Sequence, residues 1–271
     1  MTFRQLIKGS LFRFEDLKSA KDTPFWKSIV YLLVLSLLLA IPSVYQALQV
    51  MNQIKTDSLE IVEKIPDFKI EDGEIKTTKP EKGFIYQTDS IILTFDPEGK
   101  RTQKDVEKDL VGNYFSVGLL KNQALLVLPD YGGVSSAMFG DNVLKFSYKQ
   151  EPFKNMTGDK IRVGLEDWEM PVWTPLVMLL TGIYPSFINL FVTLVFAGIA
   201  GMIVAKLRLR RVTFFDCFKT IIFCAAIPTI LATIILLFQP NFDSSLLITF
   251  ISLFIFLRVT HYFPKIELPT N

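Results

Sequence analysis

Four acidic side chains crowd one short stretch of the chain, at Asp67, Glu71, Asp72 and Glu74. Two neighbouring carboxyl groups can act as a general acid and base, and clustered carboxylates can bind calcium. The sequence Asp-Phe-Lys-Ile-Glu-Asp-Gly lacks the ligand spacing of a calcium loop. Polar and apolar residues alternate around its Asp-Gly pair, which is typical of a β-hairpin. A solvated hairpin edge therefore fits the spacing better than either chemical site.

Aromatic side chains between residues 68 and 131 form a second candidate group, because aromatic rings can stack on sugar rings. They recur at the spacing of β-strands, where such residues more often form a core. The group comprises Phe68, Phe84, Tyr86, Phe95, Tyr114, Phe115 and Tyr131. The sequence leaves both a sugar site and a core open and favours the core.

Other catalytic chemistry has few residues to draw on. His261 is the only histidine, and Cys217 and Cys224 are the only cysteines. Two cysteines without histidine partners do not make a metal site, and about 10 Å of helix between them is too far for a disulfide. The chain has no glycine-rich phosphate loop, HExxH motif or nucleophile elbow. We predict no catalytic residue, no metal and no cofactor, and therefore no enzyme.

Long apolar segments indicate an integral membrane protein. Half of the residues are hydrophobic, and the mean hydropathy is +0.35. Several segments approach the roughly 20 residues that a helix needs to cross the hydrocarbon core of a bilayer. We predict four transmembrane helices, at residues 28–47, 184–205, 214–238 and 244–263.

A basic loop between the second and third predicted spans determines the topology. It contains Lys206, Arg208, Arg210 and Arg211, and short loops rich in Lys and Arg stay on the cytoplasmic side. Counting from this loop places both termini in the cytoplasm and residues 48–170 outside the cell. We therefore predict a multi-pass protein of the plasma membrane. The basic residues lie beside spans, as topology requires, so we predict no nucleic-acid partner.

Two cytoplasmic segments flank the predicted membrane helices. Residues 1–27 are basic, and their apolar residues recur at three- and four-residue spacing, as on one face of a helix. This amphipathic segment either lies in the membrane interface or packs as a solvated helix beneath the spans. Residues 264–271 form a cytoplasmic tail.

Residues 48–170 form the predicted extracellular domain, inserted between the first two spans. A helix is predicted to continue out of the first span to Lys64 and to end before Pro66. Short runs of β-branched and aromatic residues, separated by turn residues, predict an antiparallel sheet of roughly six strands. The charged stretch 102–110 predicts a helix between two of these strands. The fold class is therefore a polytopic α-helical membrane protein with an α+β domain.

Prolines are predicted to interrupt the membrane block, residues 171–263. The apolar run after residue 171 is too long for one straight span. Gly182 and Pro185 predict its division into an interfacial or re-entrant piece at 172–183 and the span that follows. Pro228 predicts either a packing kink or a hinge in the third span.

Small and polar residues suggest where the membrane helices pack. Gly198 and Gly201 are at a spacing that allows close approach of another helix. Asn189 is a polar group at depth, and bonding across helices is favoured over ligand binding. Asp216 and Lys219 lie three residues apart near the inner end of a span and are predicted to pair.

Three stretches together resemble a known family. They are the single N-terminal span, the stretch 65–75, and the basic loop leading through Phe215-Asp216-Cys217-Phe218-Lys219 to Ala225-Ala226-Ile227-Pro228. The arrangement resembles the domain-of-unknown-function 1189 family of Gram-positive membrane proteins, one branch of which (YvdJ-like) bears the name maltodextrin utilisation protein. The Ala-Ala-Ile-Pro turn also resembles Yip1-like membrane proteins, from which this chain departs by its large external domain.

The resemblance implies an association with sugar uptake and transfers no functional residue. We predict a non-enzymatic accessory or sensor protein whose external domain binds a partner or ligand. Its helices would contact the lipid bilayer and another membrane protein, such as a sugar importer, or a second copy of the chain. The alternative is a lipid-handling or membrane-shaping protein of Yip1-like type. Ionisable residues are scarce at depth, which disfavours coupled transport.

Overall fold

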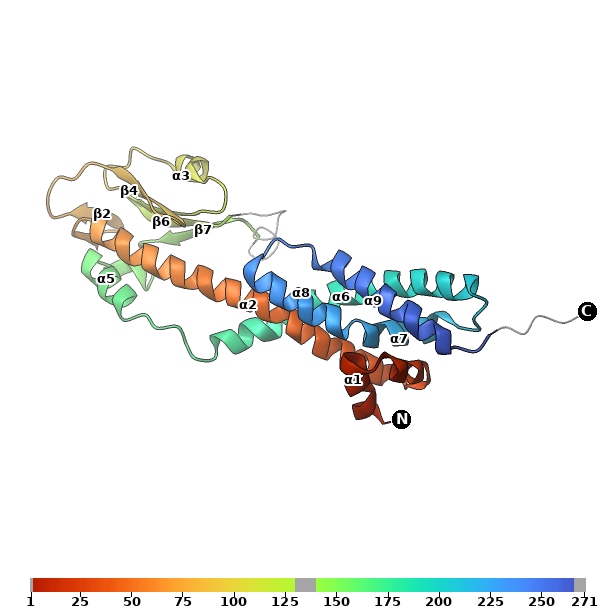
Figure 1. Cartoon of the computed structure of the whole chain (residues 1–271). Coiled ribbons are helices and arrows are strands. Elements are labelled where there is room, and N and C mark those ends of the chain that lie inside the picture. The colour runs from red at the N-terminus through yellow and green to blue at the C-terminus, as the bar shows by residue number, and fades with distance from the viewer. Residues whose placement is uncertain (1, 130–139, 266–271) are drawn as a thin grey trace, which may run out of the picture. The chain divides into compact units, whose positions relative to one another are not determined.

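The computed structural model describes residues 2–129 and 140–265 and divides the chain into two compact units (Figure 1). Unit 1 comprises Met1–Leu48 and Pro171–Asn271, and unit 2 comprises Gln49–Met170. Unit 1 is built from helices, whereas unit 2 contains the strands.

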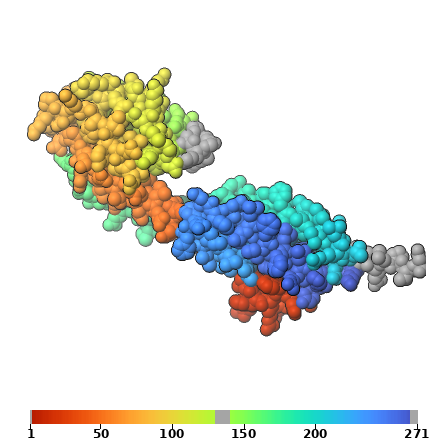
Figure 2. Space-filling view, turned by 45° about the horizontal axis from the view of Figure 1, so that its top comes forward, coloured from red at the N-terminus to blue at the C-terminus, as the bar shows by residue number. Residues whose placement is uncertain are grey.

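The N-terminal segment forms two short helices rather than one. Helix α1 (Phe3–Phe12) begins with a capping box, in which the Thr2 hydroxyl and the Gln5 side chain each bond to the other residue's backbone N–H. A 3-10 helix, η1 (Phe14–Asp22), follows. Apolar residues of both helices are buried in the core of unit 1. Figure 2 shows this segment, in red, lying against the C-terminal helices, in blue.

Helix α2 (Phe25–Lys64) is 40 residues long and contains the first predicted span. The predicted continuation of this helix to Lys64 is confirmed, and Pro66 follows two residues later. Pro42 lies inside the helix without ending it.

Helix α6 (Thr174–Leu207) is one continuous helix of 34 residues, so the predicted interruption at Gly182 and Pro185 is wrong. Proline is tolerated inside apolar helices where neighbouring helices support the turn. A Cβ on Gly182 would lie 3.8 Å from Ala40 of α2, which is an ordinary van der Waals distance, and Pro185 itself is exposed. The helix is about 50 Å long, which exceeds the hydrocarbon core of about 30 Å.

The third predicted span is divided into helices α7 (Phe214–Cys224) and α8 (Ala226–Phe238), with a bend of 47° between them. Pro228 causes the division, because it has no N–H for the carbonyl of Cys224 and its ring crowds that carbonyl. Helix α9 (Ser244–Val259) and the 3-10 turn η4 (Thr260–Tyr262) follow.

Three helical segments in the described residues are long and apolar enough to cross a membrane, or four if the bent pair α7–α8 is one span. The three are α2, α6, and α9 continued by η4. The predicted helical architecture with apolar spans is therefore confirmed in this coarser form.

Unit 2 begins with the predicted hairpin, which is confirmed. Strands β1 (Phe68–Glu71) and β2 (Glu74–Thr77) pair antiparallel around Asp72 and Gly73. Both turn residues have positive φ, 56° and 79°, the conformation for which an Asp-Gly pair is suited.

The main sheet has five strands in sequential order, and one pairing differs from the prediction. The strands are β3 (Phe84–Gln87), β4 (Ile91–Asp96), β5 (Phe115–Leu120), β6 (Gln123–Val127) and β7 (Val143–Ser147). Strands β4 and β5 are parallel, so the prediction of a fully antiparallel sheet is wrong. The intervening helix α3 (Gln103–Asp109), which the sequence predicted, makes the crossover that parallel strands require.

Two helical layers cover the sheet of unit 2. On one face lie the end of α2, the 3-10 turn η3 (Phe153–Asn155) and helix α5 (Gly158–Glu166); α3 lies on the other (Figure 1). Strand β4 is buried at all six positions because both of its faces are covered.

Candidate functional site

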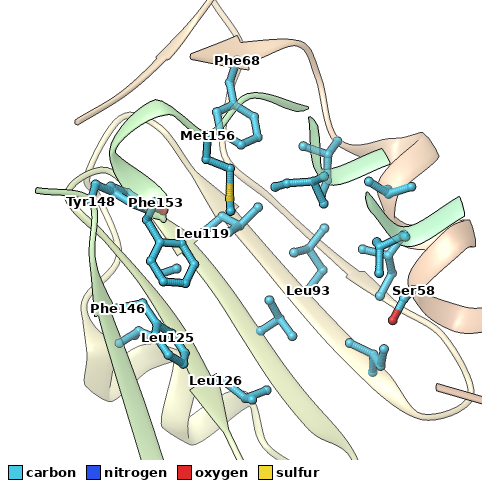
Figure 3. Close-up of a pocket in the computed structure, with 18 of the residues that line it drawn as sticks. Ser58, Phe68, Leu93, Leu119, Leu125, Leu126, Phe146, Tyr148, Phe153 and Met156 are labelled. Atoms are coloured by element: carbon cyan, nitrogen blue, oxygen red, sulfur yellow. The ribbon is translucent and has the colours of Figure 1, made fainter. Parts of the chain in front are cut away.

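Unit 2 contains an apolar cavity of about 320 Å³ between the sheet and its covering helices (Figure 3). Its wall is formed by α2, α5, η3, the hairpin and the concave side of the main sheet. Seventeen of the nineteen lining residues are apolar, and only Ser58 and Tyr148 carry a polar side chain. The cavity is therefore suited to carbon-rich ligands.

The helical wall comes from one face of α2. Ser58, Ile61, Val62 and Ile65 line the cavity, and their spacing of three and four residues places them on one side of the helix. The opposite wall includes Leu93 of β4, an interior strand of the main sheet, and this side chain is fully buried.

A buried carboxylate fixes α2 against the sheet. Asp57 is only 3% exposed and precedes the first lining residue. Its Oδ2 accepts bonds from the Ser90 backbone N–H (2.7 Å), the Ser90 hydroxyl (2.5 Å) and the Thr88 hydroxyl (2.9 Å), and its Oδ1 accepts one from Gln53 Nε2 (2.8 Å). These bonds join α2 to the β3–β4 turn, so they position the cavity wall.

The bonds to Asp57 also set its charge state. Burial by itself raises the pKa of this carboxyl, but the hydrogen bonds from Ser90, Thr88 and Gln53 outweigh burial and hold the pKa below its usual range. Asp57 is thus an ionised anchor, and its lone pairs are occupied by protein donors.

Two further contacts of α2 lie on either side of this anchor. The ammonium group of Lys55 donates to the backbone carbonyl of Trp168 at 2.6 Å and lies 5.7 Å from the centre of its ring. The hydroxyl of Tyr86 on β3 donates to Glu60 at 2.5 Å. Helix α2 is therefore held at three positions within about one and a half turns.

Tyr148 is the one lining residue with an unmet polar requirement. Its side chain is 1% exposed, and among the described residues its hydroxyl has no hydrogen-bond partner. Burial raises the pKa of this phenol far above its usual value, so it remains a neutral donor. Figure 3 shows Tyr148 directed inward toward Phe153.

The volume of the cavity is sufficient for a small apolar molecule. An engineered apolar cavity of about 150 Å³ holds one benzene molecule, so the cavity of unit 2 has room for roughly twice that. Within residues 2–129 and 140–265, no group of three or more His, Cys, Asp or Glu side chains forms a metal site.

A family model described as "Protein of unknown function (DUF1189)" matches residues 3–260. The chain belongs to this family. The resemblance inferred from the sequence is thereby confirmed. No curated protein and no solved structure matches the chain. Membership in DUF1189 assigns no role to the cavity or to any residue.

The acidic hairpin of this DUF1189 chain is a solvated edge with surface ion pairs. Lys76 lies 3.2 Å from Glu71 and 3.8 Å from Asp72, and Lys121 lies 3.5 Å from Glu74. Glu71, Asp72 and Glu74 each have a lysine beside them at the surface, as expected of a solvated hairpin edge.

Most of the aromatic candidates belong to the core of unit 2. Phe68 and Phe95 are buried, and Phe84, Tyr86 and Phe115 pack against the same cluster. Of the aromatic group, only Phe68 lines the cavity. Tyr131 lies outside the described residues. The core interpretation, rather than a sugar site, is therefore confirmed for Phe68 and Phe95.

The basic loop of unit 1 does more than carry charge. Arg208 Nη1 donates to the Leu257 carbonyl at 3.1 Å, and Arg210 Nη1 donates to the Phe263 carbonyl at 2.5 Å. Both arginines therefore satisfy carbonyls at the C-terminal end of α9 and η4, as cations at helix ends commonly do. Lys206 and Arg211 are exposed.

Two predicted polar contacts differ from the observed ones. Asp216 caps α7 through Thr213, whereas Lys219 donates to the carbonyls of Lys21 and Thr23, so the predicted pair between them is wrong. Asn189 is exposed, and it makes no hydrogen bond to another helix in the described parts of the chain.

The small and kinked positions lie against neighbouring helices of unit 1. A Cβ on Gly201 would lie 2.8 Å from Ile221, and one on Gly198 would lie 3.4 Å from Phe214. Pro228 is buried at the bend between α7 and α8, whereas Pro185 is exposed. Sequence reasoning missed the cavity. The run of residues 91–95 in β4, which is apolar except for Thr94, was the available signal for a strand covered on both faces.

Proposed function

We propose that this DUF1189 member is a non-enzymatic accessory or sensor protein of the plasma membrane whose unit 2 binds an apolar ligand. The apolar cavity is the observation that supports this proposal. Its lining offers shape and hydrophobic contact, and its two polar side chains do not form a catalytic set.

The apolar lining of the cavity favours an occupant. The cavity is partly open, so without a ligand its apolar surface stays in contact with water. A ligand that fills the cavity removes this surface from water and thereby stabilises unit 2.

Helix α2 supplies the route by which occupancy would be sensed. Ile61 and Val62 of α2 line the cavity, while Leu32 and Leu35 of the same helix belong to the core of unit 1. Because the helix is continuous, a ligand that shifts its residues at the cavity can also shift its residues in the core of unit 1. This continuity supports a sensor more than a passive anchor.

We propose four crossings, with both termini cytoplasmic and unit 2 outside. The bent pair α7–α8 decides the count. Helices of 11 and 13 residues joined at 47° span about 30 Å along the axis of the first, which matches the hydrocarbon core. A re-entrant segment needs the chain to reverse direction, which a 47° bend does not do.

Single introduced cysteines test this topology, because the native Cys217 and Cys224 are buried. In intact cells, a membrane-impermeant maleimide is expected to label Gln150→Cys and Asn241→Cys but not Lys8→Cys. If α7–α8 re-enters the cytoplasmic side, Asn241→Cys stays unlabelled while Gln150→Cys is still labelled.

Filling the cavity tests ligand binding. Ala124→Phe places a ring in the cavity, whereas Ile85→Phe changes an exposed position on β3 that does not line it. With the full chain in lipid nanodiscs, a fluorescent fatty-acyl probe is expected to bind wild type and Ile85→Phe alike and Ala124→Phe at least tenfold more weakly. Unchanged probe binding to Ala124→Phe would refute the cavity as the binding site.

Lipid handling is the second candidate function, and the same cavity favours it because an acyl chain is an apolar ligand. The basic N-terminal segment adds a surface suited to anionic lipid. Vesicles containing the protein would then exchange labelled lipid faster than empty vesicles, and Ala124→Phe would abolish the difference. A sensor binds the acyl probe without accelerating exchange.

The association with sugar uptake, and a sugar importer as partner, rest on the family resemblance alone. A maltodextrin does not suit the cavity, because its many hydroxyls need polar partners that the lining lacks. Affinity purification from native membranes tests the partner: a reproducible membrane protein is expected with the full chain. Its absence would remove the accessory role and leave ligand binding untouched.

A further inference from the structure

We propose that the ligand of the unit 2 cavity is a neutral aliphatic molecule with one hydrogen-bond acceptor, to which the Tyr148 hydroxyl donates a hydrogen bond. This inference rests on the proposed function, namely that the cavity is a ligand site. It adds the chemical class of the ligand and the residue that selects it.

The unpartnered hydroxyl of Tyr148 is the first observation. A buried hydroxyl without a partner is costly, because it gives up its bonds to water and gains none in the protein. Buried tyrosine hydroxyls therefore usually have a partner. In the described part of the chain none lies within reach of this one. Tyr148 is one of the lining residues, and its hydroxyl is fully buried, so a ligand atom that moves the side chains beside it can supply the missing acceptor.

The lack of charge in the lining is the second observation. None of the nineteen lining residues is a lysine, arginine, aspartate or glutamate. A ligand carboxylate or phosphate buried here would have no cation to pair with, which is strongly unfavourable. The nearby Asp57 is already saturated by Ser90, Thr88 and Gln53. The acceptor is therefore a neutral oxygen, such as that of an ester, ketone or ether.

The volume limits the size of the apolar part. About 320 Å³ is roughly twice the cavity that accommodates one six-carbon ring, so the chain buried in it has about twelve carbons. An acyl ester of a membrane lipid and a free aliphatic ester or ketone share this chemistry. The mass of the ligand that stays bound to the purified protein distinguishes these two sources.

Matched ligands and variants test the inference on the full chain in nanodiscs. The ligands are 2-dodecanone and dodecane, which differ in one carbonyl, each measured by displacement of the fluorescent acyl probe. The variants are Tyr148→Phe and, as control, Tyr114→Phe, whose side chain does not line the cavity. Wild type and Tyr114→Phe are expected to bind the ketone about tenfold more tightly than the alkane, and Tyr148→Phe to bind both equally.

The outcomes separate this inference from the proposed function. If neither ligand displaces the probe from wild type, the cavity is not a ligand site and the proposed function fails. If both bind wild type equally, the cavity binds ligands but Tyr148 does not select them, and only the inference fails. A preference for the ketone that persists in Tyr148→Phe would also overturn it.

A spectroscopic readout keeps the test independent of variant folding. The infrared stretch of a ¹³C-labelled carbonyl in 2-dodecanone moves to lower frequency when the oxygen accepts a hydrogen bond. The wild-type complex is expected to show this shift relative to the ketone in hexane. A band at the hexane position would contradict the bond to Tyr148 without any substitution.

Discussion

Replacing Asp57 tests whether a buried carboxylate holds the wall of the cavity in place. Asp57→Ala removes all four accepted hydrogen bonds and leaves the Ser90 N–H and hydroxyl without their acceptor, whereas the Thr88 hydroxyl can still donate to the Ile91 carbonyl. Asp57→Asn keeps the shape but loses the charge, and its amide group faces the Gln53 donor.

The magnitude follows from the number and type of bonds. A hydrogen bond to a charged group contributes about 1.5–3 kcal/mol, and water reaching the β3–β4 turn replaces part of the loss, so Asp57→Ala is expected to destabilise unit 2 by about 3–4 kcal/mol. For a unit of this size that corresponds to a fall in Tm of about 10 °C or more. Asp57→Asn is expected to lower the free energy of unfolding by about half as much.

The stabilisation that the Asp57 carboxylate provides must also decrease at low pH. Because the folded-state pKa of Asp57 is lowered, its contribution is present above the unfolded-state value of about 3.9 and is lost as the pH falls through the folded-state pKa. The difference in Tm between wild type and Asp57→Asn should therefore be constant from pH 5 to 8 and shrink below pH 4.

The assay is thermal unfolding of the full chain in nanodiscs, combined with hydrogen exchange of the amides around Ser90. Asp57→Ala is expected to increase exchange there. Glu63→Ala, an exposed change on the same helix, serves as the control. A loss below about 1 kcal/mol at pH 7, or a difference that persists undiminished at pH 3.5, would refute the anchoring role.

Two further predictions concern unit 1 and can be checked by thermal unfolding in the same membrane mimetic. Gly201→Ala places a Cβ 2.8 Å from Ile221 and is expected to lower the free energy of unfolding by about 1–3 kcal/mol. Gly198→Ala is expected to lower it less, because its Cβ would lie 3.4 Å from the nearest side chain. Equal losses in the two variants would contradict the packing described. Gln46→Leu removes the hydrogen bond from Nε2 to the Leu236 carbonyl and is expected to lower the free energy of unfolding by about 0.6–1 kcal/mol. Asn189→Leu is expected to leave it unchanged, because the Asn189 amide has no partner in the described chain. A measurable loss of stability in Asn189→Leu would show that this amide has a partner.

Elements that depend on neighbouring residues could be predicted from the sequence. The hairpin at Asp72-Gly73 and helix α3 follow from local turn chemistry and charge. The parallel pairing of β4 with β5 could not be predicted, because it depends on where the chain returns after α3. Alternation of side chains alone does not distinguish parallel from antiparallel partners.

The two prolines of the membrane block show the same limit. Pro185 leaves α6 continuous, whereas Pro228 divides α7 from α8. Their local sequences predict an interruption at both positions, but only the buried Pro228 lies at one. A proline in the sequence therefore indicates where a helix can break and does not by itself determine whether it breaks.

The candidate site was not predictable, for a related reason. A cavity arises from the volume left between α2, the sheet and α5, which no single segment encodes. Tyr148 directly follows strand β7, and the residues next to it in the sequence do not indicate that its hydroxyl is buried without a partner. The basic loop was predicted from charge, yet the bonds of Arg208 and Arg210 to the end of α9 required the folded structure.

An experimental density map of the full chain in lipid nanodiscs tests the central claim most directly. Elongated density that belongs to no protein atom is expected between Val62, Leu93 and Phe153 in wild type, and it should be absent from Ala124→Phe. A map in which these side chains meet and fill the space in wild type would contradict the account.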